Sequence, residues 1–210
     1  MINFLFGFLL LIVSPVTDSG FFEGTIKMVE ESHYDTTYYT YVIKDNQIRV
    51  DKFDHNQNSI QSLLVHLEKK EIIVLSPTKK LFTHIELSSN ACANDENLTI
   101  IKTKNSRPVN GTHCNQWRVR NKEHNTEITY WVSENNFSFF AEFTALMNHS
   151  EQTFKFFDKI PESQGFFPML TVERTLLRKV KRRVAITEIK PQTINDKLFE
   201  IPPDYKEISN

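Results

Sequence analysis

The chain has 210 residues, a formal net charge of −1 and 17 phenylalanines. The near-neutral charge argues against a protein that binds nucleic acid along a basic surface. The length suits one domain, which can bury roughly 70% of the surface of its unfolded chain.

The N-terminus carries a short apolar segment, because residues 4–13 read FLFGFLLLIV. Pro15 ends the run and small residues follow up to Gly20, which is the pattern of a cleaved signal peptide. A buried N-terminal helix is the alternative, since no Lys or Arg precedes the run. A bilayer-spanning helix needs about 20 apolar residues, and no segment of the chain has them. We expect residues 1–20 to be a signal peptide and the product to be periplasmic or secreted, soluble and without a transmembrane segment.

The chain has two cysteines, Cys92 and Cys114. An exported protein meets an oxidising compartment, so a disulfide between them is expected. Two free buried thiols are the alternative, because the sequence does not supply the pairing geometry. Two cysteines cannot provide the usual four ligands of structural zinc, and the seven histidines show no HxH or HExxH spacing. We therefore predict no metal site.

Most of the chain alternates between polar and apolar residues, with turn residues about every ten positions, which predicts an antiparallel meander. Asp45-Asn46 and Asn110-Gly111 are the clearest turn signals. Pro202 and Pro203 are expected to keep the tail LFEIPPDY extended. The predicted strands are residues 22–30, 37–44, 46–53, 60–67, 71–75, 80–87, 98–104, 114–120, 127–132, 169–177 and 180–190.

A helical pattern interrupts these strands between residues 137 and 159, where apolar residues recur at helical spacing. It predicts one helix or two short ones, ended by Pro161. Nine of the 17 Phe residues lie between Phe137 and Phe167, so this is the most apolar segment after residue 20.

Several short segments follow one another in a recognisable order. They read FEGTI at 22–26, YVIKDNQIRV at 41–50, VHLEKKEIIVL at 65–75, NGTHCNQW at 110–117 and LFEIPPDY at 198–205. Together they resemble a family of exported bacterial proteins of unknown function, which is itself similar to the periplasmic lipoprotein carriers of the LolA/LolB type. The resemblance implies a single domain over residues 21–210. It also implies a mainly β (α+β) fold, a strongly curved antiparallel sheet or unclosed barrel with one or two helices covering its concave face.

The same resemblance implies an apolar cavity under the helical segment that could hold acyl chains, and no catalytic residues. The helical segment is then either the lid of that cavity or a core helix that fills it, and an aromatic stripe is more often core. The candidate ligand-binding residues are Phe139, Phe140, Phe143, Leu146, Met147, Phe154 and Phe157.

A basic run occupies residues 178–183, with five cations in six residues. It could contact anionic lipid headgroups or a polyanion. The alternative is a solvated strand turn whose positive charge is partly balanced by acidic residues of the tail from Asp196 to Glu207. The near-neutral net charge favours the second interpretation.

No nucleophile motif, metal set or paired carboxylates stand out, so we predict no enzyme and no cofactor. The expected function is a non-catalytic periplasmic binding or carrier protein for a hydrophobic ligand, an acyl chain or a lipoprotein. The alternative is an envelope module that pairs with a partner protein through its sheet edge and has a filled core. An apolar cavity of about a few hundred cubic ångström would favour the carrier, and a filled interior would favour the module.

Overall fold

The computed structural model describes residues 22–85, 97–135, 137–147 and 154–208, which form one sheet and the segments packed on it. The predicted signal peptide, residues 1–20, lies outside the described residues. The strands are β1 (Gly24–Ser32), β2 (Thr36–Lys44), β3 (Gln47–Phe53), β4 (Ser59–His66), β5 (Glu71–Ser76), β6 (Leu81–Ile85), β7 (Leu98–Val109), β8 (Thr112–Asn121), β9 (Thr126–Ser133), β10 (Phe167–Arg174), β11 (Val180–Pro191) and β12 (Lys206–Glu207).

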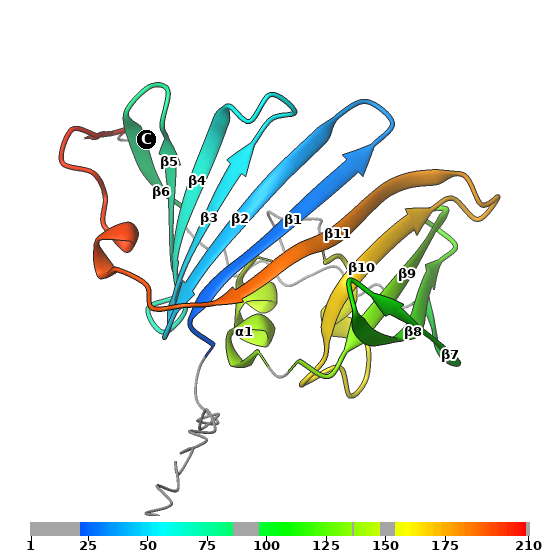
Figure 1. Ribbon diagram of the computed structural model, residues 1–210. Helices are drawn as coiled ribbons and strands as arrows, with labels where there is room; N and C mark the ends of the chain where they lie inside the picture. The colour runs from blue at the N-terminus through cyan, green and yellow to red at the C-terminus, as the bar shows by residue number, and fades with distance from the viewer. Residues whose placement is uncertain (1–21, 86–96, 136, 148–153, 209–210) are drawn as a thin grey trace, which may run out of the picture.

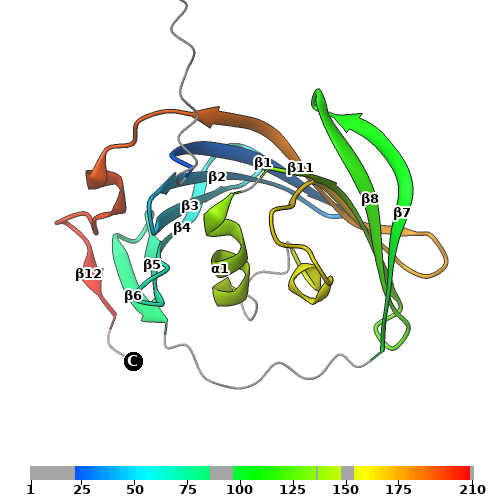
Figure 2. The ribbon, with the colours of Figure 1, turned by 90° about the horizontal axis from the view of Figure 1, so that it is seen from below.

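The 12 strands form one sheet in which two meanders lie side by side, in the order β12-β6-β5-β4-β3-β2-β1-β11-β10-β9-β8-β7. Every neighbouring pair is antiparallel except β12 and β6, which are parallel. The sheet curves strongly but does not close, because β12 and β7 form separate edges (Figures 1 and 2). This confirms the predicted mainly β, unclosed architecture.

The joint between the two meanders is the pairing of β1 with β11, and glycine is required there. A Cβ atom on Gly24 would lie 2.3 Å from the carbonyl oxygen of Lys190, a distance that no side chain tolerates. The register shifts between Lys27 and Met28 in this pair, and a bulge of this kind bends and twists a strand. Similar shifts interrupt the pairings of β3, β7 and β10, which accounts for the curvature.

The strongest turn signals of the sequence lie where they were predicted. Asp45 adopts a positive φ of 50° between β2 and β3. Asn110 and Gly111 have φ values of 47° and 77° between β7 and β8, the left-handed conformation that a two-residue hairpin turn requires.

A second layer lies in the concavity of the sheet and contains α1 (Ser138–Met147) and the 3-10 turn η1 (Phe157–Lys159), as Figure 2 shows. The helical spacing of the sequence therefore extends further than the α-helix itself. Phe156 has a left-handed φ of 62°, which lets consecutive residues Phe156 and Phe157 both point into the core.

The C-terminal tail differs from the extended segment predicted for it. Residues Asp196–Phe199 form the 3-10 turn η2, because the side chain of Asn195 accepts a hydrogen bond from the backbone of Lys197 and starts the turn. Beyond Pro203 the chain returns to the sheet as β12 and pairs with β6. No helix among the described residues is long and apolar enough to span a membrane.

Candidate functional site

The seven predicted ligand-binding residues come together on the concave face of the sheet. Six are buried, with exposed fractions between 1% for Phe143 and 8% for Phe154, and Leu146 is half-buried beside them. They join one core with residues of β1, β2 and β8–β10. The structure therefore makes this stripe a packed core, and ligand binding by its residues stays a prediction.

Aromatic rings packed edge to face hold α1 and the following turn against the sheet. The rings of Phe143 and Tyr41 on β2 are 5.8 Å apart and nearly perpendicular. The ring of Phe140 lies 5.0 Å from Phe154 and 4.8 Å from Phe167, at similar angles. Such pairs add about 0.5–1.5 kcal/mol each beyond the burial of their surface.

The hydroxyl group of Tyr130 on β9 donates a hydrogen bond to the carbonyl oxygen of Lys155. This bond fixes the 154–156 turn to the sheet, and the adjacent ring of Phe157 packs at 5.2 Å on the ring of Tyr130. The sequence showed the aromatic residues of this turn but not the tyrosine that anchors it, since β9 and the turn are far apart in the chain.

Little space remains between α1 and the sheet. A gap of about 10 Å³ lies there, and it is lined by Ile26, Met28, Tyr41, Phe139, Phe140, Phe143, Phe154 and Phe167. A single water needs about 10–15 Å³, and an apolar gap of this size stays dry. An acyl chain therefore fits under α1 only if the helix moves.

A larger hollow of about 510 Å³ opens on the other side of the helix, between α1 and the 157–166 segment. This volume lies within the roughly 300–1,000 Å³ of ligand pockets. Phe140 lines both the hollow and the gap under the helix, so its side chain is part of the wall between them. The lining residues are Phe137, Phe140, Ala141, Thr144, Phe157, Asp158, Ile160, Pro161, Glu162, Ser163, Gln164, Gly165 and Phe166.

Two carboxylates belong to the wall of this hollow, and each has a lysine partner. Asp158 lies 3.0 Å from the ammonium group of Lys159, and Glu162 lies 3.3 Å from that of Lys102. Sequence reasoning missed the lining residues between 158 and 166, because nothing in that loop signals which side faces α1. No group of three His, Cys, Asp or Glu side chains in the described part of the chain could hold a metal ion.

Cys114 is buried on β8 without a disulfide partner among the described residues, and its Sγ donates to the carbonyl oxygen of Thr112 at 3.4 Å. Burial raises the pKa of this thiol. Cys92 lies outside the described residues, so the disulfide stays a prediction.

The cations of the basic run on β11, Lys181, Arg182 and Arg183, are paired with carboxylates of the strands beside them rather than with the acidic tail. The pairs are Lys181–Glu173 at 3.8 Å, Arg182–Glu30 at 3.4 Å, Arg182–Glu173 at 3.3 Å and Arg183–Glu31 at 2.7 Å. The tail carboxylates Asp196 and Asp204 instead pair with Lys44 and Lys80. The expected balance by the tail is therefore wrong, because the tail folds back on the opposite half of the sheet.

A family model described as "Domain of unknown function (DUF4412)" matches residues 22–205. The chain belongs to the DUF4412 family. This match confirms the expected membership in a family of unknown function, and it spans nearly all of the residues that the structure describes. No curated protein matches the sequence.

Several solved structures resemble this DUF4412 protein at low identity. The crystal structure of an uncharacterized conserved protein from Thermus thermophilus has a TM-score of 0.50 and 7% identity, and the alignment covers 89% of this chain and 90% of that one. The MucA/MucB complex of Pseudomonas aeruginosa has a TM-score of 0.49 and 7% identity, covering 86% and 56%. A putative outer membrane lipoprotein-sorting protein domain from Vibrio parahaemolyticus has a TM-score of 0.31 and 8% identity, covering 84% and 87%. Likeness at such identity concerns the fold alone.

Proposed function

We propose that this DUF4412 protein is a non-catalytic periplasmic binding or carrier protein for a hydrophobic ligand, an acyl chain or a lipoprotein. The observation that supports the proposal is the hollow of about 510 Å³ between α1 and the 157–166 segment, where the aromatic rings of Phe137, Phe140, Phe157 and Phe166 line the wall together with polar side chains. Its wall continues through Phe140 into the aromatic core of the concave face.

The binding step follows from the small gap of about 10 Å³ under the helix. A ligand starts in the hollow, displaces the ring of Phe140 and widens the space between α1 and the sheet. The exchange costs little because ring contacts are replaced by contacts with ligand methylene groups, so the apolar surface stays out of water.

The packed interior also favours a second function, an envelope interaction module that holds no small ligand. In that case the partner protein pairs with the exposed backbone of a sheet edge. β7, twelve residues long, stands at the end of the strand order opposite β12.

Ala141 offers a test that spares the core, since it is exposed and lines the hollow. Ala141→Trp places an indole ring in the hollow. Glu142→Trp adds the same ring about 100° further round the helix, at an exposed residue outside the lining. The chain without residues 1–20 is titrated with a fluorescent fatty acid, and circular dichroism confirms that each variant is folded.

We expect saturable binding by the wild type, loss of at least about tenfold in affinity with Ala141→Trp and little change with Glu142→Trp. An absence of saturable binding by the folded wild type would refute the carrier function and favour the module. Equal affinities of the wild type and Ala141→Trp would show that the hollow is not the binding site. Native mass spectrometry of protein purified from its own envelope identifies the class of any lipid that copurifies.

A further inference from the structure

Two large apolar side chains are almost completely exposed, and both lie at hairpin turns. Tyr34, between β1 and β2, is 98% exposed, and Leu177, between β10 and β11, is 90% exposed. β1 is paired with β11, and Ser32 lies opposite Arg182 at the end of the pairing. Both turns therefore project from the same rim of the sheet, as Figure 1 shows.

The β10–β11 turn is held by its own hydrogen bonds, so the exposure of Leu177 is built into the structure. Thr175 accepts a bond from the backbone N–H of Arg178, donates its own N–H to the carbonyl of Lys179 and accepts from Lys179 through its hydroxyl group. The N–H of Leu176 donates to the side chain of Asn125 in the β8–β9 turn at 3.1 Å. These bonds present Leu177 at the tip, whereas Leu176 beside it is half-buried.

The charges of the basic run divide into two groups along the hairpin. The cations on β11 itself pair with carboxylates of β1 and β10, as described above. At the tip, Arg178 is 70% exposed and only reaches Glu127 at 3.8 Å, and Arg120 already binds that carboxylate at 2.7 Å. Lys179 and Lys122 of the adjacent β8–β9 turn are exposed and have no ion pair among the described residues. Two cations thus follow the exposed leucine directly in the chain, and a third, Lys122, lies next to Glu123 in the turn that is hydrogen-bonded to this tip.

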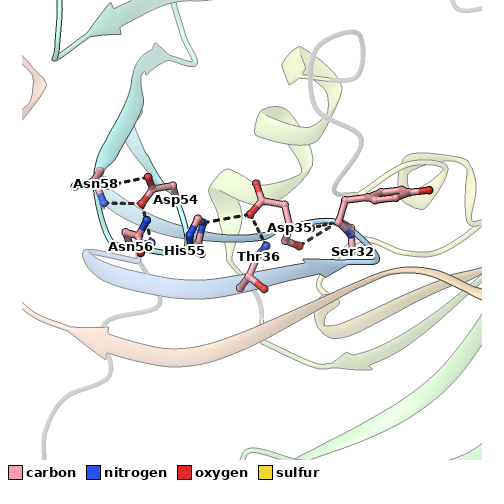
Figure 3. Close-up of polar contacts among 8 residues, drawn as sticks. Ser32, Asp35, Thr36, Asp54, His55, Asn56 and Asn58 are labelled. Atoms are coloured by element: carbon pink, nitrogen blue, oxygen red, sulfur yellow. Dashed lines mark hydrogen bonds and ion pairs between the residues drawn. The ribbon is translucent and has the colours of Figure 1, made fainter.

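The turn that carries Tyr34 has a different character, because two carboxylates lie at this part of the rim, Asp35 in the same turn and Asp54 in the β3–β4 turn (Figure 3). Asp35 lies 3.8 Å from the ring of His55, and Asp54 accepts hydrogen bonds from Asn56 and Asn58. The hydrogen bonds from Asn58 hold the pKa of the Asp54 carboxyl below its ordinary value, so it remains negatively charged. This part of the rim repels anions, whereas the β10–β11 tip attracts them.

We propose that the tip of the β10–β11 hairpin docks on a membrane surface that contains anionic lipids. Leu177 enters the boundary between headgroups and acyl chains, while Arg178, Lys179 and Lys122 face the headgroup phosphates. A single protruding leucine needs no matching pocket in a fluid lipid layer, which distinguishes this tip from a protein interface built around a contiguous apolar patch. Each cation near an anionic surface strengthens binding by roughly fivefold, so docking is reversible and sensitive to salt.

The test is cosedimentation with vesicles of phosphatidylcholine, with and without phosphatidylglycerol. The chain without residues 1–20 is used, since it contains every described residue. Leu177→Asp removes the apolar tip, and Arg178→Gln with Lys179→Gln removes two cations. Leu198→Asp in η2 is the matched control, because Leu198 is 40% exposed on a different part of the molecule. All these side chains are exposed, so folding is retained.

We expect the wild type to bind the anionic vesicles, and Leu177→Asp to bind them at least about tenfold more weakly. The double glutamine variant loses a similar factor together with most of the salt dependence, and Leu198→Asp binds as the wild type does. In Leu177→Trp, vesicles shift the indole emission to the blue and brominated lipids quench it. Binding that ignores phosphatidylglycerol, or that Leu177→Asp and Leu198→Asp reduce equally, overturns the proposal. Neither result depends on whether the protein carries a hydrophobic ligand.

Discussion

Phe143 provides the sharpest test of how the helix sits on the sheet. Its side chain is 1% exposed and its ring packs on Tyr41, so Phe143→Ala removes a ring from the centre of the concave core. A buried aromatic ring covers about 150–250 Å², which at about 25 cal/mol per Å² corresponds to an upper limit of ~4–6 kcal/mol. Measured replacements of this kind cost about 3–5 kcal/mol.

The upper part of that range applies here, because the surroundings leave so little room to relax. The gap beside Phe143 is about 10 Å³, and the walls that face α1 come from β1, β2, β10 and the turn at Phe154, which the sheet and the Tyr130 hydrogen bond hold in place. The cavity left by the ring therefore stays largely open. We expect Phe143→Ala to lower the free energy of unfolding by about 4–5 kcal/mol, measured by urea unfolding followed by circular dichroism.

Phe82→Ala is the matched control, since Phe82 is half-buried on β6 near the sheet edge. Its loss should remain below about 1.5 kcal/mol. A loss below about 1 kcal/mol for Phe143→Ala would mean that α1 does not pack on the sheet in solution. The concave face would then be open without a ligand, and the helix displacement described for ligand binding would be unnecessary.

Two further predictions concern a buried carboxylate and a sheet edge. Burial by itself raises the pKa of Glu127. The hydrogen bond and the positive charge of Arg120 outweigh this effect, so the pKa lies below the ordinary value of 4.5. The stabilisation by ionised Glu127 is therefore present above the pKa of the unfolded chain and is lost as the pH falls through the folded pKa. Glu127→Gln should reduce the dependence of the free energy of unfolding on pH in the acid range, measured by urea unfolding. An unchanged dependence would contradict this. Ending the chain at Pro203 removes the backbone bonds from Lys206 to Lys80 and from Ile208 to Phe82 and exposes β6, so we expect concentration-dependent association by light scattering. A truncated chain that stays as dispersed as the full one would show that β12 does not protect this edge.

The strand pattern was predictable because its signals are local. Alternation of polar and apolar residues reflects which face of a strand is buried, and Asn110-Gly111 marks a turn whose backbone only such residues adopt readily. All eleven predicted strands are present, with boundaries that differ mainly where β7 continues to Val109. The helical spacing at residues 137–159 correctly marked a buried aromatic segment, and of its two alternatives the described residues contain the two short segments, α1 and η1.

The remaining features depend on contacts between distant parts of the chain, which the sequence does not display. The left-handed Phe156 follows from the need to bury both it and Phe157, and the tail becomes β12 because β6 offers an open edge. The sequence by itself determined the strands, their turns and an aromatic stripe directed at the core. Only the tertiary structure decided that this stripe fills the concave face, that a hollow opens beside α1, and that Leu177 protrudes among cations. Packing, cavities and exposure are properties of surfaces brought together by folding, so no local pattern records them.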